Sequence, residues 1–128
     1  MTWGTKRLPA AFDLLAPDGS EIRAIGRVGG ASLVHCTLAP GEVTQAVRHR
    51  TVEEVWYCVA GRGHLWRRAA QTEEVTQLEP AVGVTIPLGV EFQVRSTGAA
   101  ALELLIATAP PWPGADEAVA VPGRWARR

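Results

Sequence analysis

The two side chains best suited to chemistry stand close together in the sequence: His49 and, five positions later, Glu54. Side chains on a strand alternate between its two faces, so Val47 and His49 share a face, as do Glu54 and Trp56. A short turn over residues 50–53 can set these two faces opposite each other. An imidazole and a carboxylate that meet inside a barrel suit a borderline metal such as zinc, iron, nickel or manganese.

The same pair also supports interpretations that need no metal. A carboxylate that orients an imidazole makes an acid–base pair, and a buried pair can simply satisfy its own hydrogen bonding. A tight metal site needs three or four protein ligands, and Val47 offers none. His64 is a candidate substitute ligand, although a solvated histidine at the rim is the favoured interpretation. His35 is expected at the surface or between sheets rather than at a metal.

The elements around this pair are predicted to be short strands separated by Gly and Pro turns, with no long amphipathic helix. A hairpin is expected over residues 10–30, around the turn Pro17–Gly19. Residues 71–74 are expected to be a polar hairpin tip. This pattern predicts an all-β sandwich or barrel. The further strands are expected at 31–38, 64–67, 75–78, 84–86, 92–95 and 101–106.

Two motifs give the sequence a family resemblance. Gly41, His49, Glu54 and Gly61 fit the spacing G-x5-H-x-H-x4-E-x6-G, in which Val47 replaces the first histidine. The sequence therefore resembles the first motif of the cupin family. The second motif of that family, G-x5-P-x-G-x2-H-x3-N, is matched by two residues and replaced at three positions. The matches are Pro87 and Gly89, and the replacements are Ala81, Phe92 and Ser96.

The resemblance implies one antiparallel jelly-roll barrel, or double-stranded β-helix, within a single domain of residues 1–128. Its core would cover about 30–108, after the hairpin at about 10–30 and before an extended, proline-rich strap at 109–128. Four prolines are expected to prevent regular structure in this tail. Trp112 and Trp125 are costly to leave in water, so the tail is expected to strap the barrel or a partner subunit, with a lid over the pocket as the alternative.

Composition limits the classes of partner. At 128 residues one domain is expected, and 13 Lys plus Arg balance 13 Asp plus Glu. This balance gives no electrostatic footprint for nucleic acid or an anionic membrane. The sequence has no apolar run long enough for a membrane span and no signal peptide, so a cytoplasmic protein is expected. Cys36 and Cys58 are expected to be reduced thiols.

The favoured function is a small-molecule-binding cupin whose metal site is lost or weak, so that no tightly bound cofactor is expected. The alternatives are a metal-dependent cupin enzyme (a dioxygenase, isomerase or lyase) that uses His49 and Glu54, and a metal-free acid–base catalyst. A homodimer is expected from the resemblance and from the strand at 102–106, which is apolar on both faces. The predicted pocket residues are Gln45, Val47, His49, Glu54, Trp56 and Phe92.

Overall fold

Eleven strands and one short 3₁₀ helix make up the fold, and the computed structural model describes residues 2–128. The strands are β1 (Leu14–Leu15), β2 (Glu21–Arg27), β3 (Ser32–Leu38), β4 (Val47–His49), β5 (Glu53–Ala60), β6 (Gly63–Ala69), β7 (Thr72–Leu78), β8 (Gly83–Ile86), β9 (Glu91–Ser96), β10 (Leu102–Ala109) and β11 (Ala118–Ala120), and the helix is η1 (Ala115–Glu117). No helix within residues 2–128 has the length and apolar character that a membrane span needs.

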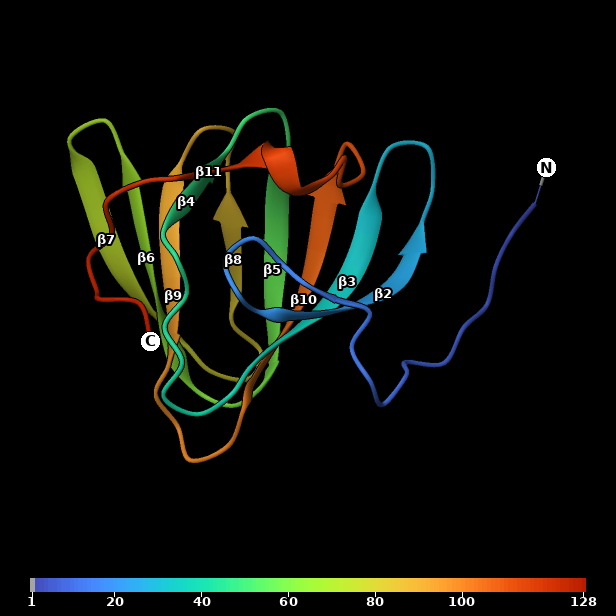
Figure 1. The fold of residues 1–128 in the computed structure, drawn as a ribbon, viewed down its shortest axis with the longest axis horizontal. Helices are drawn as coiled ribbons and strands as arrows, with labels where there is room; N and C mark the ends of the chain where they lie inside the picture. Colours follow the sequence, from blue (N-terminus) through green and yellow to red (C-terminus); the bar gives the residue numbers. More distant parts are fainter. Residues whose placement is uncertain (1) are drawn as a thin grey trace.

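The strands form two antiparallel sheets that enclose one core. The six-stranded sheet has the order β1-β2-β3-β10-β5-β8, and the five-stranded sheet has the order β11-β4-β9-β6-β7. Figure 1 shows the five-stranded sheet on the left and the six-stranded sheet on the right. This arrangement confirms the predicted all-β jelly-roll.

Period-two alternation decides which side chains reach the interior. Along β5 the burial alternates from Glu53 to Val59, so that Glu54, Trp56 and Cys58 face inward. On β9 the residue Phe92 pairs with Val47 of β4, and both side chains are buried in the core. The candidate residues therefore reach the interior from both sheets.

The proline-rich tail is more regular than the sequence predicted. Its segment 115–120 contains no proline and forms η1 and β11, and β11 pairs antiparallel with β4. The prolines lie outside that segment, so they do not remove donors from the β11 ladder. The tail therefore supplies the outer strand of the five-stranded sheet, and the expectation that it has no regular structure is wrong.

One local prediction also differs from the structure. Glu73 and Glu74 lie within β7 rather than at a hairpin tip, because the turn comes earlier, where Ala70 takes a positive φ of 53°. On β10, which lies between β3 and β5, Leu105 is half-buried between fully buried neighbours, so one face of this strand is fully buried. His35 is buried and its Nε2 lies 2.9 Å from Glu103 Oε1 on neighbouring β10.

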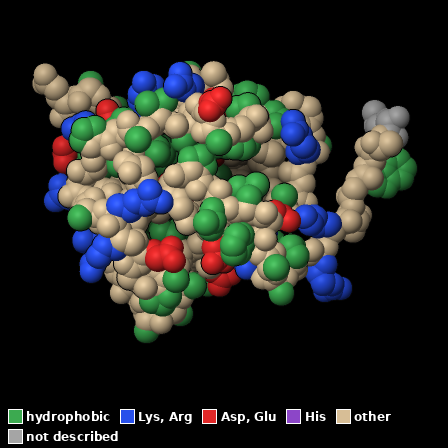
Figure 2. Space-filling view, in the orientation of Figure 1, with side chains coloured by type: hydrophobic (Ala, Val, Ile, Leu, Met, Phe, Trp, Pro, Cys, Tyr) green, Lys and Arg blue, Asp and Glu red, His purple; other side chains and the backbone are tan. Residues whose placement is uncertain are grey.

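The face of the molecule shown in Figure 2 has no single charged patch. Lys and Arg side chains are dispersed over the face shown in Figure 2, and Asp and Glu side chains lie among them. This dispersal agrees with the equal number of positive and negative side chains in the sequence.

Candidate ligand cavity

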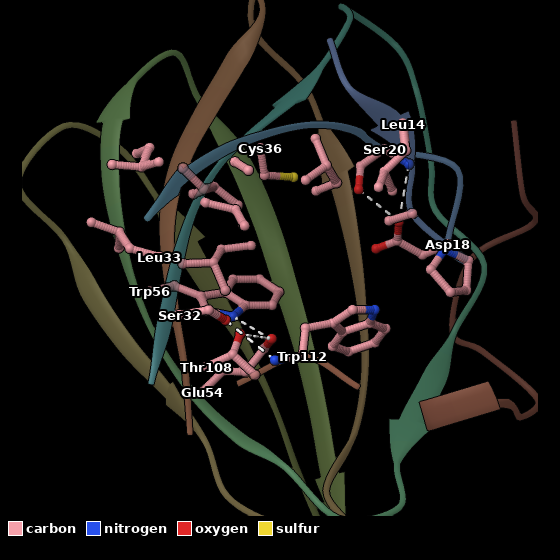
Figure 3. Close-up of a pocket in the computed structure, with 18 of the residues that line it drawn as sticks. Leu14, Asp18, Ser20, Ser32, Leu33, Cys36, Glu54, Trp56, Thr108 and Trp112 are labelled. Atoms are coloured by element: carbon pink, nitrogen blue, oxygen red, sulfur yellow. Dashed lines mark hydrogen bonds between the residues drawn. The ribbon is translucent and has the colours of Figure 1, made fainter. Parts of the chain in front are cut away.

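A cavity of about 530 Å³ lies between the sheets and extends to the β1–β2 hairpin. Most of its lining side chains are apolar, and they come from both sheets, the hairpin and the tail. The predicted residues that line it are Val47, His49, Glu54, Trp56 and Phe92. Figure 3 shows Glu54 and Thr108 at one end of the cavity, and Asp18 and Ser20 at the other.

Gln45 does not line the cavity. Its side-chain amide donates to the carbonyl oxygens of Ala46 at 3.1 Å and of Val121 at 3.4 Å. Residues 44–46 lie outside β4, which begins at Val47. The alternation that would have placed Gln45 on the same face as Val47 therefore does not apply, and that part of the predicted pocket is wrong.

The turn between β4 and β5 brings His49 and Glu54 together across the two sheets. Imidazole Nδ1 of His49 lies 4.0 Å from Oε1 of Glu54. This distance exceeds the range of a hydrogen bond, and Nδ1 is enclosed without a hydrogen-bond partner among residues 2–128. A buried polar atom without a partner is uncommon in folded proteins.

Glu54 is only 8% exposed and accepts two hydrogen bonds within the protein. Trp56 Nε1 donates to Oε1 at 2.9 Å, and the Thr108 hydroxyl donates to Oε2 at 2.7 Å. Burial raises the pKa of Glu54 above its ordinary value, although the bonds from Thr108 and Trp56 oppose this shift. The negative charges of Asp18 and Glu117 raise the pKa further.

His49 is surrounded by aromatic rings. Its ring centroid lies 5.1 Å from that of Phe92 and 5.2 Å from that of Trp112, and both pairs meet edge to face. Burial lowers the pKa of His49 to about 4, while the negative charge of Glu117 opposes this shift. The imidazole is therefore uncharged near neutral pH.

A second polar group lies at the far end of the cavity, in the loop between β1 and β2. Oδ1 of Asp18 accepts the backbone N–H of Ser20 at 2.9 Å and its hydroxyl at 2.7 Å. Burial raises the pKa of Asp18, and the hydrogen bonds with Ser20 oppose this. The sequence indicated a turn here but gave no signal that the turn would reach the barrel interior.

The residues present do not fit a tight metal site. His49 and Glu54 supply one nitrogen and one carboxylate, and both carboxylate oxygens already accept hydrogen bonds. Val47 and Phe92, which stand at the ligand positions of the motifs, have no donor atom. Within residues 2–128 no three His, Cys, Asp or Glu side chains group as metal ligands.

His64 does not complete the shell. It lies outside the cavity lining, and its Nδ1 accepts a hydrogen bond from Arg95 Nε at 3.1 Å. Its ring also lies near Trp125, with 6.4 Å between the centroids. Burial and the charge of Arg95 lower the pKa of His64. Its place is therefore in the packing of the tail against the barrel.

The two tail tryptophans have different positions. Trp112 lines the cavity and contacts His49, whereas Trp125 stacks under the guanidinium of Arg95, 4.3 Å from the ring centroid. The sequence marked both as buried aromatics but did not separate their roles, because the separation depends on where the tail crosses the barrel.

Comparison with known proteins places the fold. Residues 34–108 match the family described as Cupin domain. No protein with a curated description matches the sequence. Among solved structures, a protein from Bacillus halodurans, BH2720, is 23% identical, with a TM-score of 0.65 over 73% of this chain and 72% of that chain.

Two further structures share the fold at lower identity. The capsular polysaccharide assembling protein CapF from Staphylococcus aureus is 13% identical, with a TM-score of 0.71 over 80% of this chain but only 32% of CapF. KdgF from Halomonas sp. is also 13% identical, with a TM-score of 0.63 over 71% of this chain and 80% of that chain. At these identities the similarity establishes the fold alone.

Proposed function

Because the chain belongs to the cupin family, we propose that it binds a small, largely apolar molecule in the barrel cavity, without a tightly bound metal. The observation that carries this proposal is an apolar cavity with a few polar groups inside it, His49 and Glu54 at one end. This composition is the usual one for a ligand site. The volume of about 530 Å³ also falls within the usual range for such sites, roughly 300–1,000 Å³.

The pKa of His49 favours binding over acid–base catalysis. An efficient general base has a pKa near the working pH, whereas the pKa of His49 is about 4. His49 is thus unprotonated near neutral pH but is a weak base. A metal-dependent dioxygenase, isomerase or lyase would need more ligands than His49 and Glu54 supply.

A direct test uses 2-phenylethanol, a small apolar molecule with one hydroxyl, and isothermal titration calorimetry. We expect saturable binding at one site per chain. The variant Val34→Trp, on the cavity side of β3, should abolish binding because the indole fills the cavity. The matched control is Val75→Trp on β7, where the valine is 40% exposed and lies outside the cavity lining; it should bind as the parent does.

Two results would contradict the proposal. One is the absence of saturable binding to the parent, and the other is unchanged binding to Val34→Trp. Element analysis after dialysis tests the metal part separately. Stoichiometric iron, zinc, nickel or manganese would favour the enzyme alternative.

We also propose that the protein is a homodimer that pairs through the outer face of β5. Three neighbouring side chains on that face are apolar and exposed: Val55 at 58%, Tyr57 at 47% and Val59 at 43%. Contiguous exposed apolar surface is typical of an interaction site. Light scattering at micromolar concentration should give the dimer mass, and Tyr57→Glu should give the monomer mass. A monomer mass for the parent would refute this assembly.

A further inference from the structure

The cavity contains two carboxylates, of which Asp18 lies near the guanidinium of Arg127, whereas Glu54 has no cationic side chain of residues 2–128 beside it. Glu54 is buried, and Asp18 is half-buried at the other end. The two are close enough for the charge of Asp18 to raise the pKa of Glu54. A buried ionised carboxylate is costly unless an opposite charge and hydrogen bonds compensate it. Hydrogen bonds are present at both carboxylates, but within the described part of the chain Glu54 has no opposite charge that compensates its own.

The cationic side chains of the lining cannot supply that charge to Glu54. Among residues 2–128, Lys6 and Arg27 are the Lys and Arg that line the cavity, and both are exposed. Lys6 belongs to the segment before β1, and Arg27 ends β2. Neither forms an ion pair with Glu54 or Asp18 at 4.0 Å or less.

Aromatic rings surround the deeper carboxylate. Trp56 and Phe92 meet edge to face with 5.3 Å between centroids, and Trp112 also lines this end of the cavity. Figure 3 shows Glu54 beside Trp56, which donates a hydrogen bond to it, with Trp112 at the same end of the cavity. Aromatic faces attract cations, and groups of such rings recognise organic ammonium ions. The rings and the carboxylate thus favour the same ligand charge.

We propose that the cavity selects small molecules with a protonated amine or alkylated ammonium group on an apolar body, and that this group binds at Glu54 among the aromatic rings. This inference rests on the proposed function and adds the charge of the ligand. The ammonium supplies the positive charge that Glu54 lacks, and the apolar body fills the cavity toward Cys36 and Leu104.

Ligands of other charge match the cavity less well. An anion would lie near Glu54 and Asp18 and would be repelled by both. An uncharged ligand would leave Glu54 without an opposite charge in its buried position. The cation is therefore the charge class that improves the electrostatics at Glu54.

The test compares three ligands that share a benzene ring and a two-carbon side chain. These are 2-phenylethylamine, which is a cation at pH 7, 2-phenylethanol, which is uncharged, and phenylacetate, which is an anion. Calorimetry on the full chain should show the amine binding at least about tenfold more tightly than the alcohol. Phenylacetate should bind most weakly.

The variant Glu54→Gln removes the charge and keeps the shape of the side chain. It should reduce the preference for the amine over the alcohol to about one while the alcohol still binds. The matched control is Glu103→Gln, because Glu103 is a carboxylate of β10 that pairs with His35 outside the cavity. This control should keep the preference of the parent.

The outcomes separate this inference from the proposed function. If the alcohol binds and the amine binds no more tightly, the cavity binds ligands but the charge assignment is overturned. Tightest binding of phenylacetate, or an amine preference that persists in Glu54→Gln, also overturns it. If none of the three ligands binds, the proposed function fails, and this inference fails with it.

Discussion

Two buried carboxylates on either side of the β4–β5 turn have opposite environments. Glu117 of the tail is 4% exposed and Glu54 of β5 is 8% exposed. Glu117 accepts hydrogen bonds from the Thr51 backbone at 2.6 Å, the Thr51 hydroxyl at 2.6 Å and the Val52 backbone at 2.9 Å. Glu54 accepts bonds from Trp56 and Thr108 only, and faces the cavity.

The difference appears in their acidity. Burial raises the pKa of Glu117, but the hydrogen bonds from Thr51 and Val52 outweigh burial and leave the pKa below its ordinary value. At Glu54 burial prevails and the pKa is raised. A carboxylate that the backbone saturates holds two segments together. One that is buried with fewer donors remains available to a ligand.

The largest expected effect on stability comes from removing Glu117, the carboxylate that accepts three hydrogen bonds. Glu117→Ala should lower the free energy of unfolding by about 3 kcal/mol, because it leaves the donors of Thr51 and Val52 without a partner. Urea denaturation measures this change. As a control, Glu79→Ala removes an exposed ion pair with Arg62 and should cost about 1 kcal/mol or less. Equal losses in the two variants would contradict the role of Glu117.

Glu54 should become a metal ligand when two histidines are added beside it. Val47→His and Phe92→His together should place two imidazoles beside His49 and Glu54, because both replaced side chains line the cavity. Nickel or zinc should then stabilise the double variant by about 2.7 kcal/mol at a hundredfold excess over the dissociation constant. Thermal unfolding with and without metal measures the shift. Each single variant serves as a control, and a shift of the same size in the parent would show that its shell is already complete.

The pH dependence of stability tests the environment of His49, which both carboxylates adjoin. The pKa of His49 falls from its ordinary value of 6.5 to about 4, so between these values the unfolded state binds more protons. Its contribution is present above pH 6.5 and is lost as the pH falls toward 4. The parent should lose about 2 kcal/mol more than His49→Gln between pH 7 and pH 5. Parallel urea denaturation curves for the two proteins would rule this out.

The smallest expected effect on protein stability comes from removing the charge of Glu54. Glu54→Gln should change the free energy of unfolding by about 1 kcal/mol or less, because the lost charge had no opposite charge beside it. Glu117→Gln should be clearly less stable, because it loses a charged acceptor of three hydrogen bonds. If the two glutamine variants lose equal stability in urea, the distinction between the carboxylates does not hold.

The sequence predicted the parts of the site that depend on local spacing. Period-two alternation placed Val47 and His49 on one inward face, and Glu54 and Trp56 on another. It failed at Gln45, where the chain is not a strand. It indicated a turn at Asp18 and a buried Trp112 but did not place either in the cavity wall, because their positions depend on how distant segments cross the barrel.

The different environments of Glu117 and Glu54 could not be predicted from the sequence either. The eight residues before Glu117 contain three prolines and one glycine. No local pattern in them shows that the Glu117 side chain will contact Thr51. The 3₁₀ turn and β11 bring it there through pairing with β4. Long-range pairing of this kind follows from tertiary structure rather than from local propensity.

The pairing of β11 with β4 also sets the order in which the protein can be completed. Without β11, the strand that carries His49 is an open sheet edge, and such edges invite pairing with other chains. Residues 118–120 leave the ribosome about 70 residues after residues 47–49, so a nascent barrel passes through a stage with this edge uncovered. The tail thus closes both the sheet edge, through β11, and the cavity wall, through Trp112.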